Sequence, residues 1–426
     1  MSNATRQDAI SLWDHSAAER AEYAALDGDA SADVAIIGGG FTGASAALHL
    51  AEQGVSCIVV EAQKIGYGGS GRNAGMVNAG LWLPPQDIAA KLGEAAGSKL
   101  VKELGEAPEL VFSLIERHQM QCEAVRRGTL HAAKSASGAA DLARRAEAWK
   151  RLDAPVELLD AGETAKRVGT NAFHGALLDH RAGSINPMGY ARGLARAAAN
   201  AGARIHTSTR VNALARQGNT WRLQTGNGTV SAPSVLLATN GYSDTLWPKL
   251  STAFSPIHYF QVATKPLGPE GDEILPGREP LWDTGTIMTS VRRDAFGRLI
   301  VGSMGQLFGQ DAALSRRWAR KTIRRLFPAL GDVELETWWH GQIAMTADHL
   351  PRLFRLAPGL YAPTGYNGRG IAPGTAFGRA LAHYLAGGPE EALPLKITEF
   401  TPEPFREPRR VAMELAFKAY RLMVSV

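Results

Sequence analysis

The apolar positions of this chain follow three patterns along its length. Short continuous apolar runs at 34–37, 55–60 and 229–237 are typical of fully buried strands. Alternation of apolar and polar residues between 252 and 305 predicts antiparallel strands with one buried face. Helical patterns predict helices at 44–53, 87–119, 139–152, 188–201, 375–385 and 406–426. Further strands are expected within 121–132, 175–187, 203–211, 221–224 and 360–362.

A glycine motif joins the first strand to the first helix. Gly38, Gly40 and Gly43 have the spacing Gly-x-Gly-x-x-Gly, which permits a tight turn, close approach of the backbone to a pyrophosphate, and close packing of helix on strand. The second strand ends at Glu61, at the distance where an acid can hydrogen-bond an adenosine ribose. The motif predicts a dinucleotide site, and a glycine-rich turn in an ordinary βαβ unit is the alternative.

Two later loops are also rich in glycine and other small residues. The first, 65–80, surrounds Arg72 with small residues, which indicates backbone pressed against a flat or charged ligand. A flexible loop is the alternative, but the apolar residues that follow, up to Trp82, are unlike a solvated linker. The second loop, 364–374, leads into a helix whose N-terminus can hold another polar part of the same cofactor.

Composition places the chain among ordinary globular proteins. Its 426 residues indicate two consecutive or interleaved domains, and 45% hydrophobic with 20% charged residues is a normal balance. The net charge of +5 is scattered, without the basic stripe and interleaved aromatics of a nucleic-acid-binding protein. Cys57 and Cys122 lack metal-ligand spacing and are expected to be buried thiols, and no metal is expected. Without an apolar leader or a membrane-spanning run, a cytoplasmic location is expected.

Three glycine loops are unlike a simple nicotinamide dehydrogenase, which usually has one such fingerprint. The arrangement resembles the D-amino-acid oxidase superfamily of flavoproteins, and is most similar to its gamma-glutamylputrescine oxidase, pipecolate oxidase and sarcosine oxidase group. The resemblance covers nearly the whole chain and is specific to the superfamily, not to a substrate. It is carried by the first glycine motif with Glu61, the turn Ser70-Gly71-Arg72-Asn73, and the segments 175–187, 238–241 and 365–370.

The resemblance implies an α/β fold, in which a Rossmann-like FAD-binding domain of the glutathione-reductase type is interleaved with an α+β substrate domain built on an antiparallel sheet. The expected boundaries are an N-terminal arm at 1–31, FAD-binding segments at 32–90, 175–247 and 340–400, substrate-domain segments at 91–174 and 248–339, and a C-terminal amphipathic helix at 401–426.

The resemblance also implies which residues hold FAD. The pyrophosphate is expected at the first motif, the ribose at Glu61, the adenine at the backbone of Val211, and the isoalloxazine at 368–371. No cysteine occurs late in the chain, where sarcosine oxidase attaches its flavin, so non-covalent FAD is expected. The full expected set is Gly38, Gly40, Phe41, Thr42, Gly43, Glu61, Ser70, Arg72, Asn73, Ala74, Gly75, Met76, Val211, Thr239, Gly241, Gly365, Asn367, Gly368, Arg369, Gly370 and Ile371.

Arg292 is the leading candidate to bind a substrate, because it resembles the arginine with which relatives hold a substrate carboxylate. The register of its hairpin leaves Arg293 as a rival, and solvated surface arginines are the alternative. Other catalytic candidates are His258, Tyr259, Gln261 and Tyr366, with Trp82 and His340 as further pocket candidates. Alternation puts Tyr259 and Gln261 on one face of a strand and His258 on the other. Core packing is the alternative for each aromatic residue.

The family chemistry implied is oxidation of a primary or secondary amine, or of an amino acid, by hydride transfer to flavin N5, giving an imine that hydrolyses. O2 is the expected electron acceptor. A quinone or a partner protein is the alternative, because the segment Arg298–Gly302 has no lysine where sarcosine oxidase has its oxygen-activating lysine. The basic C-terminal helix permits contact with a membrane surface, although docking on its own domain is the simpler arrangement. The remaining alternatives are an NAD-linked dehydrogenase and a non-autonomous flavoprotein subunit, and the oligomeric state is open.

Overall fold

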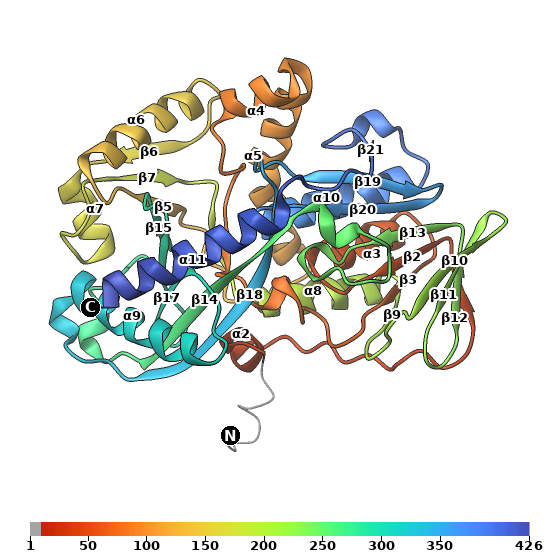
Figure 1. Cartoon of the computed structure of the whole chain (residues 1–426), viewed down its shortest axis with the longest axis horizontal. Helices are drawn as coiled ribbons and strands as arrows, with labels where there is room; N and C mark the ends of the chain where they lie inside the picture. Colours follow the sequence, from red (N-terminus) through yellow and green to blue (C-terminus); the bar gives the residue numbers. More distant parts are fainter. Residues whose placement is uncertain (1–9, 426) are drawn as a thin grey trace.

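The computed structural model describes residues 10–425, so the first nine residues of the predicted N-terminal arm lie outside the described part. Two large sheets lie side by side, with the eight-stranded sheet on the left of Figure 1 and the seven-stranded sheet on the right. The described part of the arm holds the short helix α2 (Leu12–Ser16). The mixed α/β fold class predicted from the sequence is confirmed.

The seven-stranded sheet contains the first two predicted strands. Its central strands run parallel to one another, and only β19 and β20 pair antiparallel. The strand expected at 34–37 forms as predicted, whereas that expected at 55–60 begins two residues later. In spatial order the strands are β21 (Thr398–Glu399), β19 (Arg352–Ala357), β20 (Leu360–Thr364), β13 (Ser234–Leu237), β2 (Val34–Ile37), β3 (Cys57–Val60) and β9 (Arg204–His206).

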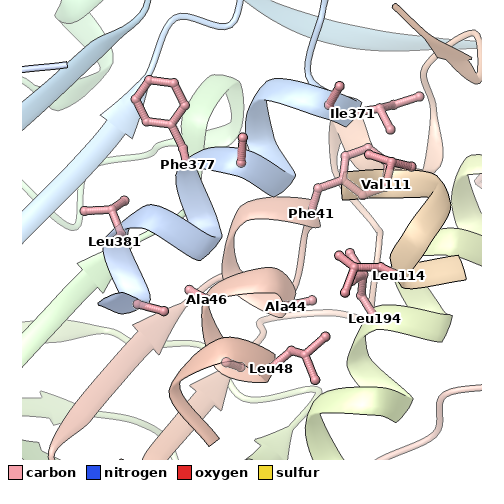
Figure 2. Close-up of a cluster of buried hydrophobic side chains, with 14 of the residues drawn as sticks. Phe41, Ala44, Ala46, Leu48, Val111, Leu114, Leu194, Ile371, Phe377 and Leu381 are labelled. Atoms are coloured by element: carbon pink, nitrogen blue, oxygen red, sulfur yellow. The ribbon is translucent and has the colours of Figure 1, made fainter. Parts of the chain in front are cut away.

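Strand β2 is apolar throughout because both of its faces are covered. Val34 and Ile36 belong to a core shared with four helices, whose side chains interdigitate in Figure 2. Ala35 and Ile37 belong to a second core, formed with a smaller sheet on the opposite face. The helices are α3 (Phe41–Glu52), α5 (Glu94–Arg117), α8 (Pro187–Asn200) and α10 (Ile371–Leu385).

The smaller sheet explains why the apolar run 229–237 is two strands rather than one. Residues before Pro233 form β12 in the four-stranded sheet, and those after it form β13 in the seven-stranded sheet. A proline donates no backbone hydrogen bond, so it suits the crossing point between two ladders. The strands of the smaller sheet are β1 (Ala30–Ser31), β12 (Thr229–Ala232), β11 (Thr220–Gln224) and β10 (Ala213–Gln217).

The eight-stranded sheet is antiparallel except where β15 pairs with β5. Phe260 and Val262 on β14 pack in the same core as Trp318 of the helix α9 (Gln310–Leu326), which the pattern analysis did not predict. The strands, in order, are β18 (Leu335–Met345), β14 (Ser255–Pro266), β17 (Arg298–Met304), β16 (Thr289–Arg293), β15 (Leu281–Asp283), β5 (Thr129–Ala132), β7 (Ala176–Asp179) and β6 (Val156–Leu159). A two-stranded sheet of β4 (Met76–Val77) and β8 (Gly183–Ser184) completes the strands.

The helical segment expected at 87–119 is divided at Gly93, whose φ of +82° ends one helix before the next begins. The strand expected at 121–132 is reduced to β5 and an isolated bridge at Val125. The other helices are α4 (Pro85–Leu92), α6 (Ala136–Lys150), α7 (Ala161–Val168) and α11 (Arg406–Ser425). No helix within 10–425 is long and apolar enough to cross a bilayer.

Sheet membership divides the chain near the expected domain boundaries. Strand β7 lies in the eight-stranded sheet, although the boundary expected at 175 would assign it to the FAD-binding domain. Strand β18 likewise belongs to the eight-stranded sheet on both sides of residue 340. The division into two domains stays a prediction. Cys57 and Cys122 are free and buried, as expected, and burial raises the pKa of Cys57 to about 11.

Phe377 tests the helix layer that supports the seven-stranded sheet. Its side chain is fully buried on α10 in the cluster of Figure 2. We expect Phe377→Ala to lower the free energy of unfolding by about 3–5 kcal/mol, because it removes buried area and leaves a cavity. Urea denaturation measures this, with Phe296→Ala as the matched control, because Phe296 is 52% exposed. Equal, small effects of both variants would contradict the packing.

Candidate cofactor and active site

The turn between β2 and α3 excludes side chains at its closest approaches. Gly38 has a φ of +110°, which favours glycine. A Cβ on Gly43 would lie 2.0 Å from the carbonyl oxygen of Gly38, so α3 begins directly against the end of β2. A Cβ on Gly40 would lie 2.8 Å from Oγ of Ser70, which accepts a hydrogen bond from the Phe41 N–H at 3.0 Å. The first two glycine segments therefore meet at the N-terminus of α3, where an anion is favoured.

Glu61 lies beside this turn at the carboxyl end of β3. Its Oε2 accepts a hydrogen bond from the Gly39 N–H at 2.7 Å, and its Oε1 accepts one from the Gln63 N–H at 2.9 Å. Burial raises the pKa of Glu61, and these two hydrogen bonds oppose the shift. The carboxyl group is thus held in place, and its binding of a ribose stays a prediction.

The third glycine loop is fixed by two asparagines. Oδ1 of Asn240 accepts hydrogen bonds from Thr364 Oγ1 and from the Gly365 N–H, both at 3.0 Å. Oδ1 of Asn367 accepts one from the Thr346 N–H at 2.8 Å, and Asn367 has a φ of +53°. These contacts place the loop immediately before α10, so a second helix N-terminus lies near the first.

One cavity of about 390 Å³ runs between these loops and the eight-stranded sheet. We call one end the dinucleotide half, lined by Gly38, Gly40–Thr42, Glu61–Gln63 and Thr209–Val211. We call the other end the sheet half, lined by Asn78, Trp82, Tyr259, Trp282, Met288, Ser290 and Met304. The volume is in the range of small-molecule sites.

Most of the predicted cofactor residues line this cavity. They are Gly38, Gly40, Phe41, Thr42, Glu61, Ser70, Arg72, Asn73, Ala74, Met76, Val211, Thr239, Gly241, Asn367, Gly368, Gly370 and Ile371. Four of the predicted residues do not line the cavity: Gly43, Gly75, Gly365 and Arg369. Of the predicted catalytic residues, Tyr259 and Tyr366 line the cavity, and His258, Gln261 and Arg292 do not.

The tyrosines present neutral hydroxyl groups. Tyr259 donates a hydrogen bond to Ser290 Oγ at 2.5 Å, and Tyr366 shares one with Thr42 Oγ1 at 3.0 Å. Burial raises the pKa of both phenols, so both stay protonated at neutral pH.

An aromatic wall bounds the sheet half. Trp82 and Trp282 meet edge to face with centroids 4.9 Å apart, and His131 stacks on Trp282 at 3.4 Å. The Arg369 guanidinium lies 4.7 Å from the Trp82 ring centroid and 5.1 Å from that of Trp282, and donates to the Ala79 carbonyl at 2.7 Å. Burial lowers the pKa of Arg369 to about 9. The charged Arg369 guanidinium therefore stabilises both tryptophan rings by cation–π contact, although Arg369 does not itself line the cavity.

Sequence reasoning missed Asn78, Trp282, Met288, Ser290 and Met304. Alternation offered a partial signal, because Trp282 lies between Leu281, which faces the core shared with α9, and Asp283, on the same strand. The same reasoning gives Ser290 the face opposite Val291.

Arg292 is buried but turned away from the cavity. Its Nη1 donates to the carbonyls of Ala74 at 3.0 Å and Ile185 at 2.8 Å, and its guanidinium lies 4.6 Å from the Trp13 ring centroid. Burial lowers its pKa to about 10. Arg292 does not line the cavity, and its role in holding a substrate carboxylate stays a prediction. Arg293 points elsewhere, to Asp272 and the Ile274 carbonyl.

His258 and Gln261 are also outside the cavity. His258 lies with its ring centroid 5.3 Å from that of His340, and burial lowers the pKa of His340 to about 4. Gln261 shares its side of β14 with Tyr259, as alternation predicted, but its Nε2 donates to the Arg72 carbonyl at 2.9 Å. Burial lowers the pKa of His258 as well, so it favours the neutral form of both histidines.

The site fits an extended dinucleotide cofactor. A glycine turn without room for Cβ atoms opens onto one helix N-terminus, an acid follows the second parallel strand, and a second helix N-terminus lies beside the first. These are the features of a dinucleotide-binding α/β fold whose cofactor reaches beyond the first βαβ unit. The model of the FAD dependent oxidoreductase (DAO) family matches residues 33–384, and the chain belongs to this family of FAD-dependent enzymes.

Two relatives and one solved structure show the extent of the similarity. The chain is 31% identical over 371 residues to a probable oxidoreductase OrdL of Rhizobium meliloti, with 87% of this chain and 86% of that protein covered. It is 30% identical over 384 residues to the gamma-glutamylputrescine oxidoreductase of Escherichia coli, with 89% of each covered. The crystal structure of glycine oxidase from Geobacillus kaustophilus matches with a TM-score of 0.69 at 23% identity, covering 87% of this chain and 100% of that one.

Gly40 tests the pyrophosphate end of the site. We expect Gly40→Val to raise the Kd for FAD by about tenfold or more, because the side chain would fill the space beside Ser70 where the backbone must approach the cofactor. The Kd follows from fluorescence titration of the apoprotein with FAD. Gly226→Val is the control, because nothing lies within 4 Å of a Cβ at Gly226. An unchanged Kd for FAD in Gly40→Val would contradict the prediction that the pyrophosphate binds at this turn.

Proposed function

We propose that this chain oxidises a primary or secondary amine whose reacting carbon bears no carboxylate. The observation that carries the proposal is that none of the seven residues named for the sheet half is charged, and neither are the β18 residues Gly341–Ala344, which also line the cavity. Arg72 also lines the cavity, but its guanidinium donates to the carbonyls of Tyr67 and His340. A carboxylate favours a paired cation when it is buried, and an amine with an apolar stem does not need one.

The names of the relatives support amine chemistry in general. The Escherichia coli relative is named for gamma-glutamylputrescine, an amine, and the Geobacillus structure is a glycine oxidase. The uncharged sheet half favours the first kind of substrate for this chain. An amino acid remains the alternative that the experiments below distinguish.

The chemistry divides between the cofactor and the chain. FAD, when bound, would supply the electron acceptor for the hydride that leaves the carbon carrying the amine. The aromatic wall of Trp82 and Trp282 would hold the apolar stem, and the hydroxyl groups of Tyr259 and Ser290 would orient the polar end. The neutral amine loses this hydride and a proton, and water then hydrolyses the imine to a carbonyl compound and ammonia or a smaller amine.

We further propose that FAD is held non-covalently and that O2 reoxidises it to give hydrogen peroxide. Both cysteines are buried and neither lines the cavity. A membrane-bound acceptor is the second candidate, because the outer side of α11 exposes Leu415 (63%) and Met423 (75%). The helix cations Arg406, Arg409, Arg410 and Lys418 are each in an ion pair, which weakens attraction to anionic lipid. An oxygen electrode, with and without added quinone, separates the two acceptors.

A substrate panel tests the proposed class. We expect anaerobic mixing with primary and secondary amines to bleach the flavin absorbance at a rate about tenfold or more above that for the matching α-amino acids. The comparison uses pairs that differ only in the α-carboxylate. Faster bleaching by the amino-acid member of each pair would contradict the proposal. A colourless protein that binds no flavin would contradict the family assignment itself.

The pH dependence of kcat/KM tests the uncharged sheet half. Tyr259 stays protonated because its pKa is raised, and Arg369, whose pKa is lowered to about 9, keeps its charge below pH 8, so between pH 6 and 8 the titrating group is the substrate amine. Since only the neutral amine reacts, kcat/KM should rise about tenfold per pH unit below the amine pKa and then level off. Two substrates of different amine pKa should give profiles displaced by that difference. Superimposable profiles would assign the titration to the enzyme.

A further inference from the structure

The loop from Gly69 to Ala74 has an unusual feature: all six of its carbonyl groups accept hydrogen bonds from side chains. Asn73 Nδ2, within the loop, donates to the carbonyls of Gly69 at 3.0 Å and Ser70 at 2.8 Å. The next four carbonyls are bound by side chains far away in the sequence. This part of the chain, Gly71–Ala74, we call the pinned segment.

The distant donors come from two places, the N-terminal arm and the eight-stranded sheet. From the arm, Ser11 Oγ donates to the Gly71 carbonyl at 2.6 Å, and Trp13 Nε1 donates to that of Asn73 at 2.8 Å. From the sheet, the donors are Gln261 Nε2 to Arg72 at 2.9 Å, Trp339 Nε1 to Arg72 at 3.0 Å, and Arg292 Nη1 to Ala74 at 3.0 Å.

These donors also contact one another. The rings of Trp13 and Trp339 meet edge to face with centroids 5.6 Å apart, and the Arg292 guanidinium lies over the face of Trp13. Gly75 has a φ of +72°, and a Cβ there would lie 2.1 Å from Nη1 of Arg292. The side chain of Arg292 therefore passes across the backbone at a position where only glycine fits.

The arm is fixed firmly enough to hold the loop. Trp13 is fully buried, and Asp14 next to it pairs with Arg192 and, at 2.7 Å, with Lys64. Burial opposes ionisation of Asp14, but its hydrogen bond with Lys64 and the charge of Arg192 lower its pKa overall. Further along, Glu19 pairs with Arg196 at 2.8 Å. The helix α2 is thus attached to α8 by the buried pair of Asp14 with Arg192, and the arm is attached further by the partly exposed partners Lys64 and Arg196.

The consequence concerns the cofactor. Arg72, Asn73 and Ala74 line the cavity, and their carbonyl oxygens are all directed at protein donors. A carbonyl turned toward the cavity would place a partial negative charge next to the electron-accepting cofactor. The N–H groups of Arg72, Asn73 and Gly75 donate hydrogen bonds within the loop. The peptide whose carbonyl Trp13 holds is different, because its N–H group, that of Ala74, is left to meet a negatively polarised ligand.

We propose that Ser11 and Trp13 of the N-terminal arm, together with Arg292, Gln261 and Trp339, are positioning residues that fix the pinned segment and so set the affinity for FAD and its reduction potential. The inference rests on the family's cofactor and not on the substrate proposed above. It gives the arm, Gln261 and Arg292 a function that none of them can have as a cavity-lining residue.

Trp13→Phe is the central test, because it removes one N–H donor and keeps an aromatic ring under Arg292. We expect the Kd for FAD to rise about three- to tenfold, the flavin absorbance band to shift, and the reduction potential to fall, because a released carbonyl disfavours the added negative charge of the reduced flavin. Fluorescence titration, absorbance spectra and equilibration with a reference dye measure these three quantities.

Trp221→Phe is the matched control. Trp221 is also buried, and its Nε1 also donates to a backbone carbonyl, that of Pro358 at 3.1 Å, but it does not line the cavity or contact the pinned segment. We expect it to lower Tm by a similar amount and to leave the Kd, the spectrum and the potential unchanged. Equal flavin properties in both variants would reduce Trp13 to a structural role and overturn the proposal.

Arg292 provides a second test that does not depend on Trp13. Arg292→Lys keeps a donor and should retain most of the affinity for FAD, whereas Arg292→Met should lose about tenfold or more. Arg293→Met is the control, since Arg293 contacts Asp272 and the Ile274 carbonyl instead. If Arg292→Met fails to fold, Ser11→Ala replaces it as the smaller change. An unaltered Kd for FAD and an unaltered reduction potential in the folded variants of Arg292 and Ser11 would overturn the proposal.

Discussion

The close approach of α3 to β2 is the constraint on which the rest of this structure depends. It requires glycine at Gly43, where a Cβ would lie 2.0 Å from a backbone oxygen of Gly38. A second glycine makes a similar close contact between helices. A Cβ on Gly378 of α10 would lie 2.6 Å from the Thr42 carbonyl oxygen of α3. α10 therefore packs against α3 at backbone distance. Two helix N-termini, separated by more than 300 residues of sequence, open onto one cavity as a result.

That packing also explains the difference between the two halves of the cavity. The dinucleotide half is built from chain turns, whose N–H groups and a single buried acid suit phosphate and ribose. The sheet half is built from side chains, of which Tyr259, Trp282, Ser290 and Met304 come from strands of the eight-stranded sheet and the other three from loops. Backbone recognises the part of a ligand that is constant, and side chains recognise the part that varies between enzymes of one fold.

The sequence predicted the parts of the fold that depend on local spacing. The first strand and the glycine turn are confirmed, since each rests on neighbouring residues in order. The FAD family is confirmed as well, because its motifs are each local although they are spread over nearly the whole chain. Pro233 marks the break between β12 and β13, but the apolar pattern alone predicts one run there. The helix α9 was not predicted, because its many arginines interrupt the apolar pattern. Arg292 shows the limit most clearly. The sequence left the hairpin register open between Arg292 and Arg293, and it could not show where the long side chain of Arg292 ends, which is decided by Gly75 and Ile185 from another part of the chain.

The N-terminal arm raises the same point for function. Nothing within residues 10–31 looks like a site, because its residues neither form a glycine turn nor line the cavity. Trp13 nevertheless lies against Arg292 of the eight-stranded sheet and donates a hydrogen bond to the carbonyl of Asn73, which does line the cavity. A side chain can act on a ligand by deciding which side of a peptide group faces it. Such an effect leaves no motif in the sequence, since the donor, the peptide and the ligand belong to three different segments.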